Sequence, residues 1–189
     1  LTPPTTRYAL ASASFANTAR FASYRVTFPT IRAGTSNSMQ VAEVQLITSG
    51  DVTSPSDVIS ITFPEGASSP TGETVVNLVD NRLDRKLDII NAGAGPTIVD
   101  IAPVAGQTVV SGMTLYGAAD DAGFPGRTPQ NVTIEGSADG VNYSSLYTGA
   151  LTANVANFSD QSVSFENAVA YTHYRITFDV PFGGGDMQL

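Results

Sequence analysis

A length of 189 residues with 42% hydrophobic residues is enough for one well-buried core. The absence of cysteine excludes disulfides, thiolate metal sites and a cysteine nucleophile. The net charge of −8 argues against binding to nucleic acid or anionic lipid, and no apolar run reaches the roughly 20 residues of a membrane span, so we expect no membrane insertion.

The chain repeats part of itself. The segment "ASYRVTF" at 22–28 returns as "THYRITF" at 172–178, and the residues before both segments align without gaps at the same offset of 150. Such a period is typical of a tandem repeat of a domain. We therefore predict that residues 1–48 are the C-terminal third of a preceding repeat, and that residues 49–189 form a second domain.

The two copies differ after the repeated strand. The first continues as "MQVAEVQLI" at 39–47, whereas the second reaches only "MQL" at 187–189, so we expect the second domain to lack its own final strand. Alternation in the first copy predicts a strand there. Its residues Val41, Val44 and Leu46 are the candidates for closing a sandwich, either within this chain or in a neighbouring copy.

Short strands are predicted along most of the remaining chain, with one short helix at 72–80. The segment "NVTIEGS" at 131–137 alternates apolar with polar residues, and "AYTHYRITF" places Tyr174 and Phe178 on its core face. Asp139-Gly140 is a strong signal for a hairpin turn. Many short strands separated by turns predict an all-β, antiparallel sandwich.

Three segments together resemble the discoidin-like, or coagulation factor 5/8 type C, branch of the galactose-binding-like domains. They are "NLVDN" (77–81), "LYGAADDAGFPGRTPQNVTIEGSADGVNYSSLYTG" (115–149) and "YRITF" followed by "GGDMQL" (174–189). The resemblance covers most of residues 49–189. It implies an antiparallel jelly-roll β-sandwich.

The resemblance also implies one structural Ca²⁺. By position its ligands are Asp80, Asp84 and, from the last strand of the first copy, Glu43, together with backbone carbonyls. Calcium takes six to eight oxygen ligands, so carboxylates and carbonyls from distant segments are chemically suitable. The alternative is a solvated acidic turn without an ion.

Sugar-binding relatives use the loops at one end of the sandwich, where an aromatic platform lies beside groups that bind hydroxyls. The loop "GAADDAGFPGRTP" offers Asp120, Asp121, Phe124 and Arg127 as the candidate ligand-binding residues. The alternative is that Asp121 and Arg127 pair with each other and only shape the loop.

We expect no enzymatic activity. His173 is the only histidine, and the first copy has Ser23 at the equivalent position, which favours a solvent-facing role on the strand. The adjacent pair Asp120-Asp121 does not match glycoside hydrolysis, which needs two carboxyl groups across a cleft, about 5 to 10 Å apart.

Two functions stay open. The first is an extracellular or cell-surface module that binds a glycan or polysaccharide and serves adhesion. The second is a structural repeat whose copies associate end to end into a filament by strand complementation. Charge favours the second, because residues 1–40 carry +4 whereas the equivalent residues 151–188 carry four acids and one arginine.

Overall fold

The structure, a computed structural model, describes residues 25–27 and 52–189. The chain divides into two units at Gly50 and Asp51, and the second unit contains every strand given below. Within the described residues all helices are short 3-10 helices, and none is long and apolar enough to cross a bilayer.

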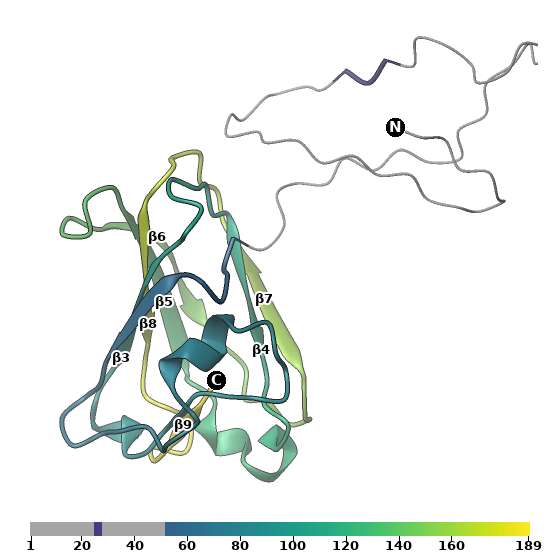
Figure 1. Ribbon diagram of the computed structural model, residues 1–189. Coiled ribbons are helices and arrows are strands. Elements are labelled where there is room, and N and C mark those ends of the chain that lie inside the picture. Colours follow the sequence, from purple (N-terminus) through teal and green to yellow (C-terminus); the bar gives the residue numbers. More distant parts are fainter. Residues whose placement is uncertain (1–24, 28–51) are drawn as a thin grey trace, which may run out of the picture. The chain divides into compact units, whose positions relative to one another are not determined.

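One layer of the sandwich is an antiparallel five-stranded sheet (Figure 1). Its strands alternate buried with more exposed side chains, because one face covers the core and the other faces solvent. Tyr174 and Phe178 are 5% and 2% exposed, which confirms the predicted strand and its core face. From edge to edge the strands are β1 (Val58–Thr62), β3 (Thr97–Ala102), β8 (His173–Phe178), β5 (Asn131–Ser137) and β6 (Ser144–Ala150).

The facing layer consists of two antiparallel pairs, β4 (Gly112–Tyr116) with β7 (Asp160–Ser164), and β2 (Asp88–Ile89) with β9 (Met187–Gln188). Leu87 and Leu189 extend the second pair through backbone hydrogen bonds of 2.8 and 2.9 Å. The segment "MQL" therefore already belongs to this layer. A further closing strand stays a prediction, because Val41, Val44 and Leu46 lie outside the described residues.

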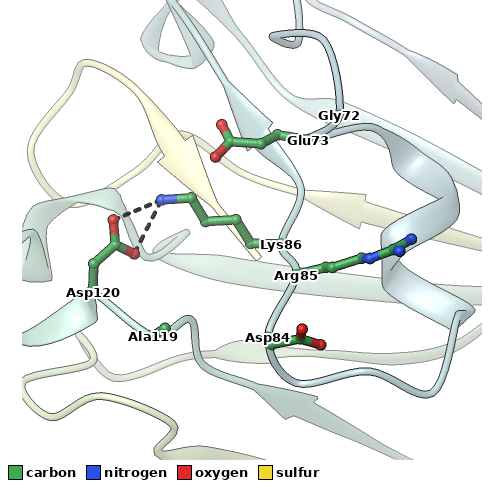
Figure 2. A pocket seen from close by; sticks show the side chains of 7 residues that line it. All are labelled: Gly72, Glu73, Asp84, Arg85, Lys86, Ala119 and Asp120. Atoms are coloured by element: carbon green, nitrogen blue, oxygen red, sulfur yellow. Dashed lines mark hydrogen bonds and ion pairs between the residues drawn. The ribbon is translucent and has the colours of Figure 1, made fainter.

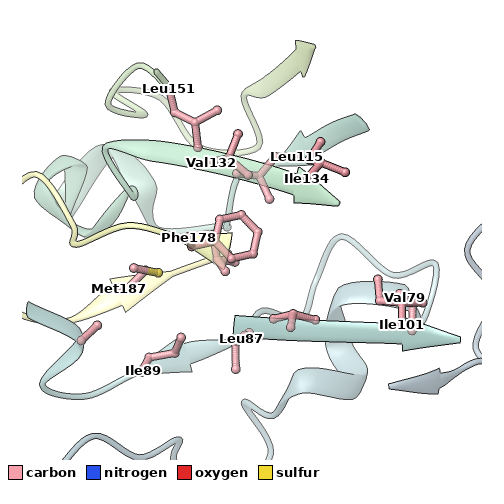
Figure 3. Packing of buried hydrophobic residues seen from close by; sticks show 13 residues of the cluster. Val79, Leu87, Ile89, Ile101, Leu115, Val132, Ile134, Leu151, Phe178 and Met187 are labelled. Atoms are coloured by element: carbon pink, nitrogen blue, oxygen red, sulfur yellow. The ribbon is translucent and has the colours of Figure 1, made fainter. Parts of the chain in front are cut away.

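The core fills the space between the two layers (Figure 3). Burying a large apolar side chain contributes about 1.5–3 kcal/mol, so this cluster supplies much of the driving force for folding. It also fixes the strand ends from which the loops emerge. The five-stranded sheet contributes Val99, Ile101, Val132, Ile134 and Phe178, and the facing layer contributes Leu87, Ile89, Leu115 and Met187.

Turns and 3-10 helices connect the strands. The predicted turn at Asp139-Gly140 joins β5 to β6, and Gly140 has the positive φ of 73° that such a turn needs. The predicted helix at 72–80 is a 3-10 helix, η1. The 3-10 helices are η1 (Val75–Val79), η2 (Ala92–Ala94), η3 (Asp121–Gly123) and η4 (Pro125–Arg127).

Candidate functional site

Four connecting segments gather at one end of the sandwich, which is the lower end in Figure 1. We call this region the loop end; it comprises residues 72–87, 117–130, 151–159 and 179–186. Strand pairing brings segments 117–130 and 151–159 together, because the last residue of β4 pairs with the first residue of β7. Backbone hydrogen bonds then connect the loops directly, with Gly183 N–H donating to the Gly126 carbonyl at 2.7 Å and Phe158 N–H to the Ala118 carbonyl at 3.0 Å.

Exposed aromatic side chains concentrate at this end. Among the described residues, the strongly exposed aromatic side chains are Tyr116, Phe124, Phe158 and Phe182, with exposures between 44% and 53%. Tyr116 borders the loop end and the other three lie within it. Aromatic rings normally gain free energy by burial, so their exposure makes this end of the sandwich the candidate site.

The predicted residues Phe124 and Arg127 lie together. The Arg127 guanidinium lies over the Phe124 ring, 4.2 Å from the ring centroid, and also pairs with Asp186 at 3.4 Å and Asp88 at 3.6 Å. The phenyl ring is thereby held in place while the residue stays 45% exposed. A hollow of about 300 Å³ adjoins the ring, bounded by Gly123–Arg127, Gly183, Gly185 and Asp186; we call it the aromatic hollow.

A second hollow, of about 390 Å³, is lined in part by Ala119 and Asp120, the residues immediately before η3 (Figure 2). We call it the charged hollow, because its lining includes Glu73, Asp84, Arg85, Lys86 and Asp120. Lys86 Nζ reaches across it to Asp120, with distances of 3.0 and 2.7 Å to the two carboxylate oxygens. No hydrogen bond or ion pair within residues 25–27 and 52–189 engages the Glu73 carboxylate.

The Lys86–Asp120 pair fixes the charge state of this hollow. Burial by itself raises the pKa of Asp120, but the hydrogen bond and the positive charge of Lys86 outweigh burial, so the pKa lies below its usual value. Asp120 is therefore a carboxylate at neutral pH. The three N–H groups of Lys86 are used by Asp120 and Gln188, so the hollow presents mainly carboxylate oxygens, which can accept hydrogen bonds from hydroxyls.

Asp121, the remaining predicted ligand residue, is only 2% exposed. Its Oδ2 accepts hydrogen bonds from Ala118 N–H at 3.0 Å and Asn154 Nδ2 at 2.7 Å, and its Oδ1 accepts one from Gln188 Nε2 at 2.5 Å. The predicted alternative, in which Asp121 pairs with Arg127, is wrong. The buried Asp121 carboxylate instead ties its loop to Asn154 and Gln188 through hydrogen bonds. Arg127 pairs with Asp88 and Asp186.

The side chain of Gln188, which is 4% exposed, forms hydrogen bonds with residues of both hollows. Its Oε1 accepts hydrogen bonds from Lys86 Nζ at 3.1 Å and from Arg127 Nη1 at 3.4 Å. Its Nε2 donates to Asp120 and Asp121. One amide therefore binds both a side chain of the charged hollow and a side chain of the aromatic hollow.

Two of the three predicted calcium ligands, Asp80 and Asp84, lie within the described residues and pair with arginines. Asp84 is held by the Arg82 guanidinium at 2.9 and 2.5 Å, and Asp80 accepts the Arg82 N–H at 3.0 Å and pairs with Arg85 at 3.5 Å. The described part of the chain contains no group of three His, Cys, Asp or Glu side chains that could hold a metal. The third predicted ligand, Glu43, lies outside the described residues, so the calcium ion stays a prediction.

Sequence reasoning found one part of the site and missed another. Phe124 and Arg127 stand in one Gly/Pro-rich loop, which made them recognisable. Glu73, Lys86 and Gln188 lie far apart in the sequence and share no motif with that loop. The positive φ of Phe158, 55°, and the exposed Phe182 had no sequence signal either.

By sequence, no family model and no curated protein matches the chain. Solved structures do match it. The Clostridium perfringens module CpGH89CBM32-5, in complex with GalNAc-β-1,3-galactose, is 16% identical over 69% of this chain and 89% of its own, with a TM-score of 0.53.

Two further structures have a TM-score of 0.54. The family 32 carbohydrate-binding module of Clostridium perfringens NanJ, in complex with galactose, is 15% identical over 70% of this chain and 88% of its own. Chitosan-binding module 1 from a chitosanase/glucanase of Paenibacillus sp. IK-5 is 14% identical over 75% and 95%. The described domain therefore has the galactose-binding-like, discoidin-like jelly-roll fold that its motifs predicted.

Proposed function

We propose that this domain is a non-catalytic carbohydrate-binding module whose ligand lies on the loop end. The observation that carries the proposal is the exposed Phe124 ring, held from one side by Arg127 and bordered by the aromatic hollow. The C–H groups of a sugar ring form an apolar face that packs on an aromatic ring. Sugar hydroxyls then need hydrogen-bonding groups at the edge of that platform.

The loop end supplies such groups. Asp186 is partly exposed beside the Phe124 platform, and the free Glu73 carboxylate lies in the charged hollow. Hydrogen bonds that involve a charged partner are stronger than those between neutral groups, so a few of them can orient a sugar. The structures described above support this class of ligand, since their modules bind galactose, GalNAc-β-1,3-galactose or chitosan.

A glycan panel tests the proposal. The purified full chain is titrated calorimetrically with galactose, GalNAc-β-1,3-galactose, glucosamine oligosaccharides and several plant and microbial polysaccharides. We expect saturable binding to at least one of them and a loss of about tenfold or more in affinity for Phe124→Ala. The matched control is Val141→Ala, which truncates a 77% exposed apolar side chain in the β5–β6 turn, outside the loop end.

Two outcomes would count against the proposal. Absence of binding across the whole panel would remove the function. Equal losses for Phe124→Ala and Val141→Ala would remove the loop end as its location. The extracellular or cell-surface location, the adhesive role and the association of copies into a filament stay proposals that need the intact protein in its own cell.

A further inference from the structure

Building on the proposed function, we infer that the ligand is an oligosaccharide of at least two sugar units, which lies across η3 and occupies both hollows at once. A single terminal sugar would fill only one of them. The inference concerns the length of ligand that the site recognises, and it assigns the charged hollow as a second sugar subsite.

The two hollows are neighbours along the chain. Asp120, which lines the charged hollow, is the residue immediately before η3, and Gly123, which lines the aromatic hollow, is its last residue. A 3-10 helix rises about 2 Å per residue, so about 6 Å of backbone separates these two walls. That length is comparable to one sugar ring. Adjacent rings of one oligosaccharide can therefore reach both hollows.

Each hollow is small and chemically incomplete. Volumes of about 390 and 300 Å³ stand at the lower limit of ligand pockets, which usually measure about 300–1,000 Å³. The aromatic hollow has a platform, Phe124, but both of its charged groups, Arg127 and Asp186, already pair with each other. The charged hollow has no aromatic lining, but it offers the Glu73 carboxylate, which has no hydrogen bond or ion pair among the described residues.

Gln188 holds the two hollows in a fixed relation. Because its buried side-chain amide bonds to Lys86, Asp120 and Arg127, these three side chains are positioned by one shared group. A second sugar unit therefore meets groups that are already oriented, which keeps the entropic cost of its binding low. We expect affinity to rise steeply from one unit to two and only weakly thereafter.

The test compares ligand length with site variants. Galactose is titrated against GalNAc-β-1,3-galactose, and glucosamine against its disaccharide and trisaccharide, with the full chain, Phe124→Ala and Glu73→Gln. The disaccharide of the better series should bind at least about tenfold more tightly than its monosaccharide. Both variants should weaken the disaccharide, while only one of them should weaken the monosaccharide.

Glu73→Gln keeps the shape of a partly exposed side chain, so its folding is expected to be unchanged, which thermal unfolding verifies. Equal affinities for monosaccharide and disaccharide, together with an unaffected Glu73→Gln variant, would overturn the two-hollow inference and leave the proposed function intact. Failure of every sugar to bind would instead remove the proposed function itself.

Discussion

The two ends of the sandwich are built in opposite ways. At the β5–β6 end, the Asp139 carboxylate accepts hydrogen bonds from Val141 N–H at 2.9 Å and Asn142 N–H at 2.8 Å, and from the Ser137 hydroxyl at 2.9 Å. At the loop end, by contrast, Lys86 reaches a partner 34 residues away in Asp120 and another 102 residues away in Gln188.

In the Asp139 turn the polar groups form hydrogen bonds with one another, whereas the loop end leaves some of its polar and aromatic groups exposed. The Asp139 turn uses its own backbone donors; hydrogen bonding from the Asn142 backbone is the main cause that lowers the pKa of Asp139. The loop end leaves the Glu73 carboxylate without a partner among the described residues and exposes three phenyl rings. A turn of the first kind stabilises the fold, whereas a surface of the second kind is available to a ligand.

The largest effect is expected from Asp121→Ala, which removes the buried carboxylate under the loop end. At least three hydrogen-bonded groups lose their acceptor, so we expect a fall of about 3 kcal/mol in the free energy of unfolding, measured by urea denaturation. Asp84→Ala is the control, because that carboxylate is 65% exposed and should contribute little. If Asp121→Ala changed the free energy of unfolding no more than Asp84→Ala does, the hydrogen bonds of Asp121 would not be what holds the loop end together.

The next effect concerns the opposite end. Gly140 has a φ of 73°, and a Cβ there would lie 3.2 Å from the His173 ring. Gly140→Ala should therefore cost about 1–2 kcal/mol of stability while glycan affinity stays unchanged. Gly185→Ala, where an added Cβ meets nothing within 4 Å, is the stability control. Loss of glycan binding in folded Gly140→Ala would contradict the claim that the β5–β6 end takes no part in binding.

A smaller effect is expected from Arg127→Lys, which keeps the charge but loses the planar guanidinium over Phe124. We expect a loss of about 1 kcal/mol in stability and a severalfold weaker affinity for glycan. Arg175→Lys is a matched control, since Arg175 lies 4.0 Å from the Tyr143 ring centroid and pairs with Asp100 at 2.8 Å, outside the loop end. Identical glycan affinities for the two variants would contradict the assignment.

The smallest effect is a pH dependence. Because the pKa of Asp120 is lowered in the folded state, its pairing with Lys86 contributes stability above the unfolded pKa of about 3.9, and this contribution disappears as pH falls through the folded pKa. The pair is partly exposed, so we expect Asp120→Asn to cost less than about 1 kcal/mol at pH 7. Urea denaturation at pH 7, 5 and 3 measures the difference in unfolding free energy between Asp120→Asn and the parent protein. A difference between variant and parent that grows towards pH 3 would have the wrong sign.

Sequence patterns predicted the fold wherever the determining contacts are local. Apolar alternation identified the core faces of β5 and β8, and Asp139-Gly140 identified the hairpin, because period-two burial and a positive φ are written into neighbouring residues. The motif order extended this to the jelly-roll sandwich, which the structural comparisons confirm.

The site was predictable only in the segment that contains Phe124 and Arg127. The pairing of Asp121 could not be deduced, because its partners Asn154 and Gln188 stand 33 and 67 residues away and adjoin it only in the folded sandwich. Lys86 and Glu73 likewise become neighbours of Asp120 through the packing of two segments, 72–87 and 117–130. Long-range polar contacts of this kind leave no periodicity in the sequence.

The most direct test of the account maps the ligand onto the protein. The ¹⁵N-labelled chain is titrated with the tightest-binding oligosaccharide of the panel, and amide chemical-shift changes are followed by NMR. We predict that the changes concentrate in both hollows, at residues 72–73, 84–86, 119–127 and 183–186, while the turn at 137–143 stays unchanged. Changes centred on that turn, or spread evenly over the sheet, would contradict a ligand site at the loop end.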